Sequence, residues 1–387
     1  MSKIHILHVL WDDDFGGVER HVLDLLTNID RSEFDCELCI LHDDKNRIAK
    51  GVRELGIPVH HANLRSGFDI CGMWRFIKFA RKKKFDVIHS HIYPLWMQLA
   101  VGCLLKSINI VRLHGQDVVE KSTFRSIVMN RLSRFVTDGY VTPSEIHKTT
   151  MVKLYYIPPA KIHVLHHGID TSRFCPLSPS ERVKKRRELG INEGDFAIGN
   201  VGRLAEQKNL PCFIRASVLI HDEMPNTRFF IVGYGELEEK LRQAVKKEKA
   251  EDYIIFLGRR TDIREILGAW DVFMFTTWVE SFGLVALEAM AAGLPLVASN
   301  STSLPEVVGD TGILIGIDDH EAFAIEVIKL LKNDEMRQRM AHDARERAVN
   351  VFSMDVMIGK MSIIYKTLMA TKHKQGRQAK SNEAKFV

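Results

Sequence analysis

The run FAIGNVGRL, residues 196–204, determines how this chain is organised. Its apolar part, Phe196–Val201, has the length and composition of a buried strand, and Gly202 ends it. The preceding segment, Asp170–Gly194, has a different character, because it contains two prolines and the charged run ERVKKRRELG. A buried strand directly after such a break predicts that a second domain begins here.

On both sides of this break, apolar runs of strand length alternate with amphipathic runs of helix length. In the first half we expect strands at 4–10, 34–41, 87–92, 110–113, 139–142 and 162–166, and helices at 18–28, 74–83, 95–105 and 124–135. In the second half we expect strands at 196–201, 228–232, 253–257, 272–276 and 296–298, and helices at 210–221, 236–248, 263–269, 282–292, 321–332, 336–349 and 356–370. Such alternation predicts an α/β fold whose parallel sheets are covered on both faces.

The length of 387 residues also suits more than one domain. We expect domains at 1–169 and 170–355, a helix at 356–370 and a disordered basic tail at 371–387. Two α/β halves joined by one linker predict a cleft between them, where ligands usually bind.

Positive charge is concentrated in the first half. The net charge is +5, and 13 basic against 4 acidic residues lie between Arg65 and Arg134. Aromatic residues adjoin the cations in the runs 74–84 and 124–135. Two interpretations remain open: a solvated helix face, or contact with an anionic membrane surface or a lipid diphosphate. Nucleic acid is not expected, because no recognition motif is present.

Cysteine usage and hydropathy bear on the compartment. The six cysteines are scattered, which favours a reducing environment over a disulfide scaffold. No apolar stretch is long enough to cross a bilayer, and no signal cleavage site follows the first apolar run. We therefore expect a cytoplasmic protein, either free or peripheral on the cytoplasmic face of the membrane.

Several catalytic signatures are missing. The sequence contains no P-loop motif, no G-x-G-x-x-G, no G-x-S-x-G and no H-E-x-x-H. His89 and His91 share a strand face and His114 follows the next expected strand, so a three-histidine metal site is conceivable. No carboxylate is spaced to complete it, and we predict no metal.

Two loops have the composition of phosphate-binding loops. Gly16 and Gly17 open the first helix, where backbone N–H groups can approach a phosphate, although such a pair can also simply turn the chain. After Gly202, Arg203 and Lys208 place two cations just before a helix. They form either a solvated loop or a clamp for a nucleoside diphosphate.

The most specific feature is Glu280–Glu288, an E-x7-E pair. We expect a helix to begin near Ser281, so that Glu280 lies at its start and Glu288 about two turns later on roughly the same face. Apolar neighbours surround Glu288, so its carboxylate must either find a hydrogen-bond partner or shift its pKa, and ribose hydroxyls would suit it as partners. The alternative is a helix-capping Glu280 with a salt-bridged Glu288.

Together these residues resemble the retaining GT-B glycosyltransferases of family four. Further matching stretches are 87–91, 113–117, 141–144, 167–170, 232–235 and 295–306. His167 stands where the family usually has Asn. The resemblance implies two Rossmann-like domains facing a central cleft, a final helix that crosses back to the first domain, and a reaction without a metal or other cofactor.

The resemblance also implies roles for individual residues. Arg203 and Lys208 would bind the donor diphosphate with backbone contact from Gly16 and Gly17, Glu288 would bind the ribose, and His114 would lie beneath the transferred sugar. Glu280 with the amides of Ser281, Phe282, Gly283 and Leu284 would hold the donor sugar and phosphate.

We therefore predict transfer of a sugar, with retention of configuration, from a nucleoside-diphosphate sugar to a glycan or lipid-linked acceptor. A UDP-sugar is the expected donor, and polysaccharide or glycoconjugate biosynthesis is the expected context. The alternatives are a nucleotide-sugar epimerase or a phosphorylase of the same fold, and a non-catalytic scaffold at a membrane surface.

Overall fold

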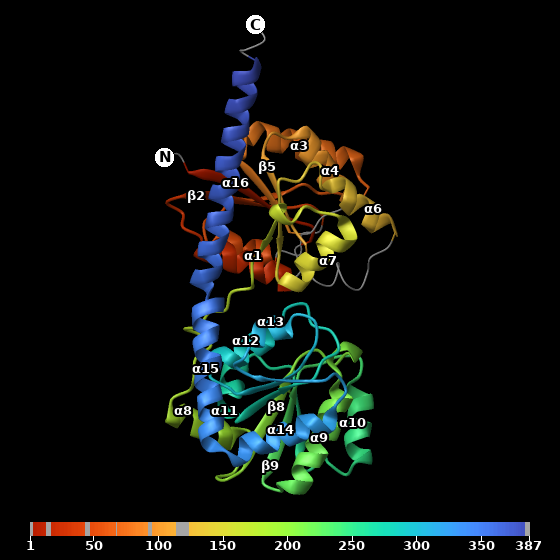
Figure 1. The fold of residues 1–387 in the computed structure, drawn as a ribbon, viewed down its shortest axis with the longest axis vertical. Helices are drawn as coiled ribbons and strands as arrows, with labels where there is room; N and C mark the ends of the chain where they lie inside the picture. The colour runs from red at the N-terminus through yellow and green to blue at the C-terminus, as the bar shows by residue number, and fades with distance from the viewer. Residues whose placement is uncertain are drawn as a thin grey trace. The chain divides into compact units, whose positions relative to one another are not determined.

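The protein is described by a computed structural model that details residues 3–12, 17–42, 47–66, 68–91, 95–113 and 124–383. The chain divides into two compact units (Figure 1). Met1–His167 and Met357–Val387 form the first unit, and Gly168–Val356 forms the second. Each unit contains a parallel sheet with helices around it, which confirms the predicted α/β fold with two Rossmann-like domains.

The sheet of the first unit has the strand order β3-β2-β1-β4-β5-β6-β7. Its strands are β1 (Ile4–Leu10), β2 (Phe34–Ile40), β3 (Val59–His61), β4 (Val87–Ser90), β5 (Ile108–Arg112), β6 (Gly139–Thr142) and β7 (Ile162–Val164). Its helices are α1 (Gly17–Asn28), α2 (Ile48–Glu54), α3 (Ile70–Lys83), α4 (Leu95–Leu104), α6 (Phe124–Ser133), α7 (Glu145–Tyr155) and most of α16 (Met354–Glu383). Strands β2 and β3 therefore lie on one side of β1, and strands β4 to β7 lie on the other. The place between β1 and β4 where the strand order reverses is the turning point of this sheet.

The second unit repeats this plan with the order β10-β9-β8-β11-β12-β13. Its strands are β8 (Phe196–Val201), β9 (Thr227–Val232), β10 (Ile254–Gly258), β11 (Val272–Phe275), β12 (Leu296–Ser299) and β13 (Ile313–Ile315). Its helices are α8 (Pro179–Glu188), α9 (Leu210–Glu223), α10 (Glu238–Lys247), α11 (Ile263–Ala269), α12 (Leu284–Ala291), α13 (Leu304–Val308), α14 (His320–Lys332) and α15 (Asp334–Phe352).

Strand β8 is central to the second unit, because its side chains pack into the apolar clusters on both faces of the sheet. Ala197 and Val201 pack into one apolar cluster, and Ile198 packs into the cluster on the opposite face, as the period of a strand requires. Between them, Gly199 lies under the Trp270 ring, where a Cβ would come within 2.2 Å of a ring carbon. The close contact between Gly199 and Trp270 therefore fixes the position of the β8 backbone and, with it, the start of the loop that follows.

The charged segment before β8 is an integral part of the second unit. It forms α8, which begins with a capping box between Ser178 and Glu181. Arg182 Nη1 donates to the carbonyls of Gly268 (2.6 Å) and Trp270 (2.9 Å), and its other nitrogen binds Asp271 (2.7 Å). The basic run ERVKKRRELG thus attaches α8 to the end of α11.

The expectation of a disordered tail at 371–387 is wrong for residues 371–383, which continue helix α16. Lysine, arginine, glutamine and alanine, which dominate this stretch, are good helix formers, and no proline interrupts them. Lys372 also fixes the helix to the first unit, since its Nζ donates to the Ser107 carbonyl at 2.8 Å. Within the described residues, no helix is both long and apolar enough to span a membrane.

Candidate functional site

Two predicted donor-binding residues of the second unit, Lys208 and Glu280, lie where the strand order of its sheet reverses. After β8 the chain adds β9 and β10 on one side, and it returns to add β11 on the other. The carboxyl ends of β8 and β11 therefore lie where the strand order reverses, which is where open α/β sheets bind ligands. Lys208 lies in the loop after β8 and Glu280 in the loop after β11.

Lys208 and Glu280 are in direct contact, Nζ to Oε2, as an ion pair. Both side chains are largely buried, with 14% and 15% of their surfaces exposed. The Lys208 ammonium also lies 5.4 Å from the centre of the Phe275 ring, a cation–π contact. The pair places one positive and one negative charge side by side in a site that excludes most water, where both act strongly on a ligand.

Hydroxyl groups after β12 hold the backbone of Glu280. Thr302 Oγ1 accepts from the Glu280 N–H (2.9 Å) and donates to the Glu280 carbonyl (2.7 Å), and Ser303 Oγ donates to the same carbonyl (2.9 Å). Thr302 and Ser303 are not among the predicted site residues. The hydroxyl-rich run Ser299–Ser303, directly after a buried strand, is the feature of the sequence that indicates them.

The loop that contains Lys208 is tied to the loop that contains Glu280. Thr277 Oγ1 and the Trp278 N–H both donate to the Gln207 carbonyl at 2.8 Å, and Thr276 Oγ1 donates to the Lys208 carbonyl at 3.3 Å. These hydrogen bonds fix the backbone of both loops, and the fixed backbone holds the side chains of Lys208 and Glu280 in contact.

Arg203 lies apart from this pair in the present conformation. Its side chain is 69% exposed and contacts Glu236 at 3.2 Å, a residue outside the predicted site. Its loop packs against the loop after β9, where Gly233 has φ +139° and a Cβ would come within 1.8 Å of the Gly202 carbonyl oxygen. Only glycine permits this approach, which explains the glycine at the end of β9.

Helix α12 begins at Leu284, three residues later than expected, because Gly283 adopts a left-handed conformation with φ +91°. Glu280 therefore lies in the preceding loop, and the predicted helical alignment of the two glutamates is wrong. Ser281 and Phe282 also precede the helix, with Phe282 buried in the core. Glu288 is half-buried in α12. The first amides of α12 have no acceptor within the helix, which leaves a positive end at the site.

The predicted residues of the first unit are described only in part. Gly17 is the first residue of α1, directly after the turning point of that sheet. Gly16 and His114 lie outside the described residues. The conceivable trio of His89, His91 and His114 is therefore not tested as a set.

A different histidine trio does occur in this unit. His8 and His89 are opposite each other on β1 and β4, and His91 is two residues further along on the same face. Ligand nitrogens of these three buried residues lie within 4.8 Å of one another. Burial lowers the pKa of His8 to about 3, so the ring is neutral at pH 7 and could act as a ligand.

A buried cation beside this trio opposes a metal ion. Arg112, on β5, is 1% exposed, and its charge is one of the influences that lower the pKa of His91, after burial and the neighbouring histidines. Burial lowers the pKa of Arg112 itself to about 9, so it remains charged at pH 7. Among the described residues the guanidinium nitrogens have no hydrogen-bond partner. A divalent cation would therefore be repelled, and the geometry alone does not make this a metal centre.

Two family models together match most of the chain. Residues 15–173 match Glycosyltransferase Family 4, and residues 181–347 match Glycosyl transferases group 1. The chain belongs to the GT-B glycosyltransferases of family four. The sugar-transferring class of enzyme that the sequence predicted is thereby confirmed.

Individual relatives cover between 77% and 96% of the chain. A UDP-Gal:alpha-D-GlcNAc-diphosphoundecaprenol alpha-1,3-galactosyltransferase of Escherichia coli is 27% identical over 96% of this chain and 99% of its own length. An N-acetyl-alpha-D-glucosaminyl L-malate synthase of Bacillus anthracis is 27% identical over 77% of this chain and 79% of its own. Among solved structures, HepE of Anabaena in complex with UDP matches 94% of this chain and 100% of its own, with a TM-score of 0.83 at 19% identity. The last likeness shows the shared fold.

Proposed function

We propose that this glycosyltransferase moves a sugar, with retention of anomeric configuration, from a UDP-sugar to a glycan or lipid-linked acceptor. The observation that supports it best is the Lys208–Glu280 ion pair at the turning point of the second sheet. A site with a largely buried ammonium group, an adjacent carboxylate and a helix start suits a sugar attached to a diphosphate. The context we expect is the biosynthesis of a polysaccharide or glycoconjugate.

The chemistry requires charge stabilisation on the leaving group. As the bond between the anomeric carbon and the diphosphate oxygen breaks, negative charge builds on the phosphates and positive charge on the sugar ring. Lys208 would exchange its contact with Glu280 for a phosphate oxygen. Arg203 would join it, since its exposed pair with Glu236 is weak enough to be replaced.

The carboxylates and the helix start would orient the donor. Glu280, once released by Lys208, would accept hydrogen bonds from sugar hydroxyls, and Glu288 from the ribose. The amides of the segment Ser281–Leu284 would donate to the phosphate. We expect no metal ion to be needed, because two cations and a helix start already provide positive charge.

The first unit would supply the acceptor side. His114 would lie beside the ring as positive charge develops, and Gly16 and Gly17 would contact the diphosphate through their backbone. The E. coli relative acts, by its name, on a sugar linked to diphosphoundecaprenol. The cationic stretch between Arg65 and Arg134 suits an acceptor of that kind, or an anionic membrane on the cytoplasmic side.

Calorimetric titration of the full chain with UDP, GDP and ADP tests the donor. We expect UDP to bind most tightly and Lys208→Ala to lose most of that affinity. The matched control is Lys329→Ala, which removes the lysine of an exposed pair with Glu326 on α14. The absence of any nucleotide binding would favour a scaffold, and tighter binding of GDP or ADP would contradict the proposed base.

Product analysis tests the reaction. NMR of the product formed from a UDP-sugar and a lipid-linked glycan should show the anomeric configuration of the donor. An inverted product would contradict retention. Conversion of the UDP-sugar to its epimer without any acceptor would instead identify an epimerase of the same fold.

A further inference from the structure

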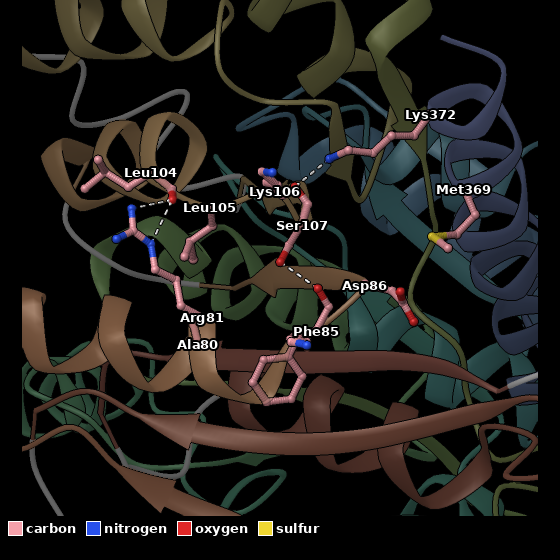
Figure 2. Close-up of a pocket in the computed structure, with 11 residues that line it drawn as sticks. Ala80, Arg81, Phe85, Asp86, Leu104, Leu105, Lys106, Ser107, Met369 and Lys372 are labelled. Atoms are coloured by element: carbon pink, nitrogen blue, oxygen red, sulfur yellow. Dashed lines mark hydrogen bonds between the residues drawn. The ribbon is translucent and has the colours of Figure 1, made fainter. Parts of the chain in front are cut away.

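A cavity lies at the amino ends of two strands in the sheet of the first unit. It has a volume of about 690 Å³ and is shown in Figure 2. Phe85 and Asp86 precede β4, and Lys106 and Ser107 precede β5, so the cavity borders the amino ends of these strands. The turning point between β1 and β4, where this unit would bind substrate, lies at the carboxyl ends of the strands. This cavity is therefore separate from the acceptor region.

Four cations surround the cavity against one acid. The cations are contributed by the end of α3, by the loop after α4 and by α16, and they are Arg81, Lys84, Lys106 and Lys372. The acid is Asp86, whose Oδ2 accepts the His5 N–H at 2.9 Å. The cavity therefore presents a net positive charge, which favours an anionic ligand.

Uncharged carbonyls hold two of the four cations in place. The Arg81 guanidinium donates to the Leu104 carbonyl at 2.9 and 3.3 Å, and the Lys372 ammonium donates to the Ser107 carbonyl at 2.8 Å. A carbonyl orients a cation without neutralising it. The nearest carboxylate to Lys372 is Asp138, at 3.9 Å. Burial lowers the pKa of Lys372, which an anion in the cavity would reverse.

The side chains of the other two cations, Lys84 and Lys106, are exposed to solvent, where an anion can reach them. Lys84 ends α3 in a left-handed conformation, and Lys106 lies in the loop between α4 and β5. Neither makes an ion pair or side-chain hydrogen bond with any residue in the part of the chain that the structure describes.

The rest of the wall is apolar. Ala80 and Phe85 are buried beneath it, and Leu104, Leu105 and Met369 are half-buried. Figure 2 shows Met369 and Lys372 on the same helix, α16, facing the loop that contains Ser107. An apolar floor with a cationic rim fits a ligand that has both an anionic group and hydrocarbon. A fully hydrated anion would gain nothing from the apolar surface.

The course of helix α16 bears on where such a ligand comes from. Beyond Lys372 it continues to Glu383, and Figure 1 shows it extending past the strands of the first unit. The next cation on the helix, Lys374, is exposed two residues beyond Lys372. Positive charge that extends from the cavity onto the exposed surface of the helix suits an extended anionic surface better than an isolated small molecule.

We propose that this cavity binds an anionic phospholipid of a membrane, with its phosphate at the lysine rim and the upper part of its acyl chains on the apolar floor. The proposal extends the membrane contact suggested under the proposed function, and it assigns that contact to a defined pocket instead of a diffuse basic face. The lipid is a ligand of this site and is not the acceptor.

Vesicle flotation with the full chain tests the proposal. We expect binding to vesicles that contain phosphatidylglycerol and little binding to phosphatidylcholine alone. Lys84→Gln with Lys106→Gln should weaken binding by roughly fivefold for each charge removed, or roughly twenty-fivefold together. The matched control is Lys78→Gln with Lys82→Gln, which removes two exposed charges of α3 outside the cavity. Equal losses in the two double variants would overturn the proposal, because they would indicate a diffuse surface.

A short-chain phosphatidylglycerol below its micelle concentration separates the possible ligands. Saturable binding of one molecule per chain, lost in the Lys84/Lys106 variant, is the expected result. Inorganic phosphate binding as tightly as this lipid would overturn the assignment to a lipid. The same variant should bind UDP normally. Loss of vesicle binding is thus distinguishable from failure of the glycosyltransferase proposal, which UDP titration reports.

Discussion

Lys208 and Glu280, 72 positions apart in the chain, form an ion pair between the loops after β8 and β11. Each residue neutralises the other in this arrangement. A diphosphate that binds here must compete with the Glu280 carboxylate for the Lys208 ammonium. The pair is therefore both the preformed part of the donor site and an energetic barrier to binding, and the two roles can be separated by substitution.

Glu280→Gln should raise the affinity for UDP while it lowers transfer. The amide keeps the shape of the side chain but removes a negative charge beside the diphosphate, so we expect roughly fivefold tighter UDP binding. Transfer should fall by roughly a hundredfold, because the carboxylate that orients the sugar is lost. Calorimetry and initial rates measure the two effects. Weaker UDP binding in this variant would show that Glu280 does not compete for Lys208.

Lys208→Met should destabilise the second unit, because it leaves the Glu280 carboxylate largely buried without its cation. We expect a loss of about 1–3 kcal/mol in the free energy of unfolding, measured by urea denaturation. Adding Glu280→Gln should recover much of this loss, because no unpaired charge remains. The exposed pair of Lys329 and Glu326 provides the reference cycle, with a coupling of less than about 1 kcal/mol. Similar coupling energies in the two cycles would argue against a special environment at the site.

Thr302→Val should reduce activity through the position of Glu280. The substitution preserves the shape of the side chain but removes a hydroxyl that both accepts from and donates to the Glu280 backbone. We expect a stability loss of about 1–3 kcal/mol and a fall in kcat/KM with little change in the binding of free UDP. Ser303→Ala removes a single donor to the same backbone and should have the smaller effect. An effect on UDP affinity alone would contradict a role in holding Glu280.

The sequence was sufficient to predict the fold because strand and helix periods are local properties. Phe196–Val201 is a strand, as predicted, and the alternation that follows it requires a parallel sheet. The start of α12 was predicted wrongly because it depends on the left-handed conformation of Gly283, which faces Leu304 from another part of the chain. Composition does not reveal such a contact.

Contacts between residues that are far apart in the chain could not be predicted from the sequence either. Lys208 and Glu280 were each selected, but nothing in either motif indicated that they contact each other. The trio of His8, His89 and His91 depends on the register between β1 and β4, in which His8 is opposite His89. Motif spacing within one strand identified only His89 and His91.

Acid should destabilise the first unit because of two members of this trio, His8 and His91. Burial lowers the pKa of His8 to about 3, and burial with the neighbouring histidines lowers the pKa of His91 well below its usual value. An unfolded chain takes up protons at these residues as the pH falls below about 6.5, and the folded chain does not. The stability that these neutral rings provide is therefore complete above pH 6.5 and declines toward pH 3. Between pH 6.5 and 5, His8 alone should account for about 2 kcal/mol.

Urea denaturation of the full chain at a series of pH values measures this decline. His8→Gln should reduce the slope of unfolding free energy against pH below 6.5 by about one proton, whatever its effect at pH 7. The slope is the deciding quantity, since a general loss of packing would shift the curve at every pH without tilting it. A slope in His8→Gln equal to that of the unmodified chain would mean that His8 takes up its proton in the folded state.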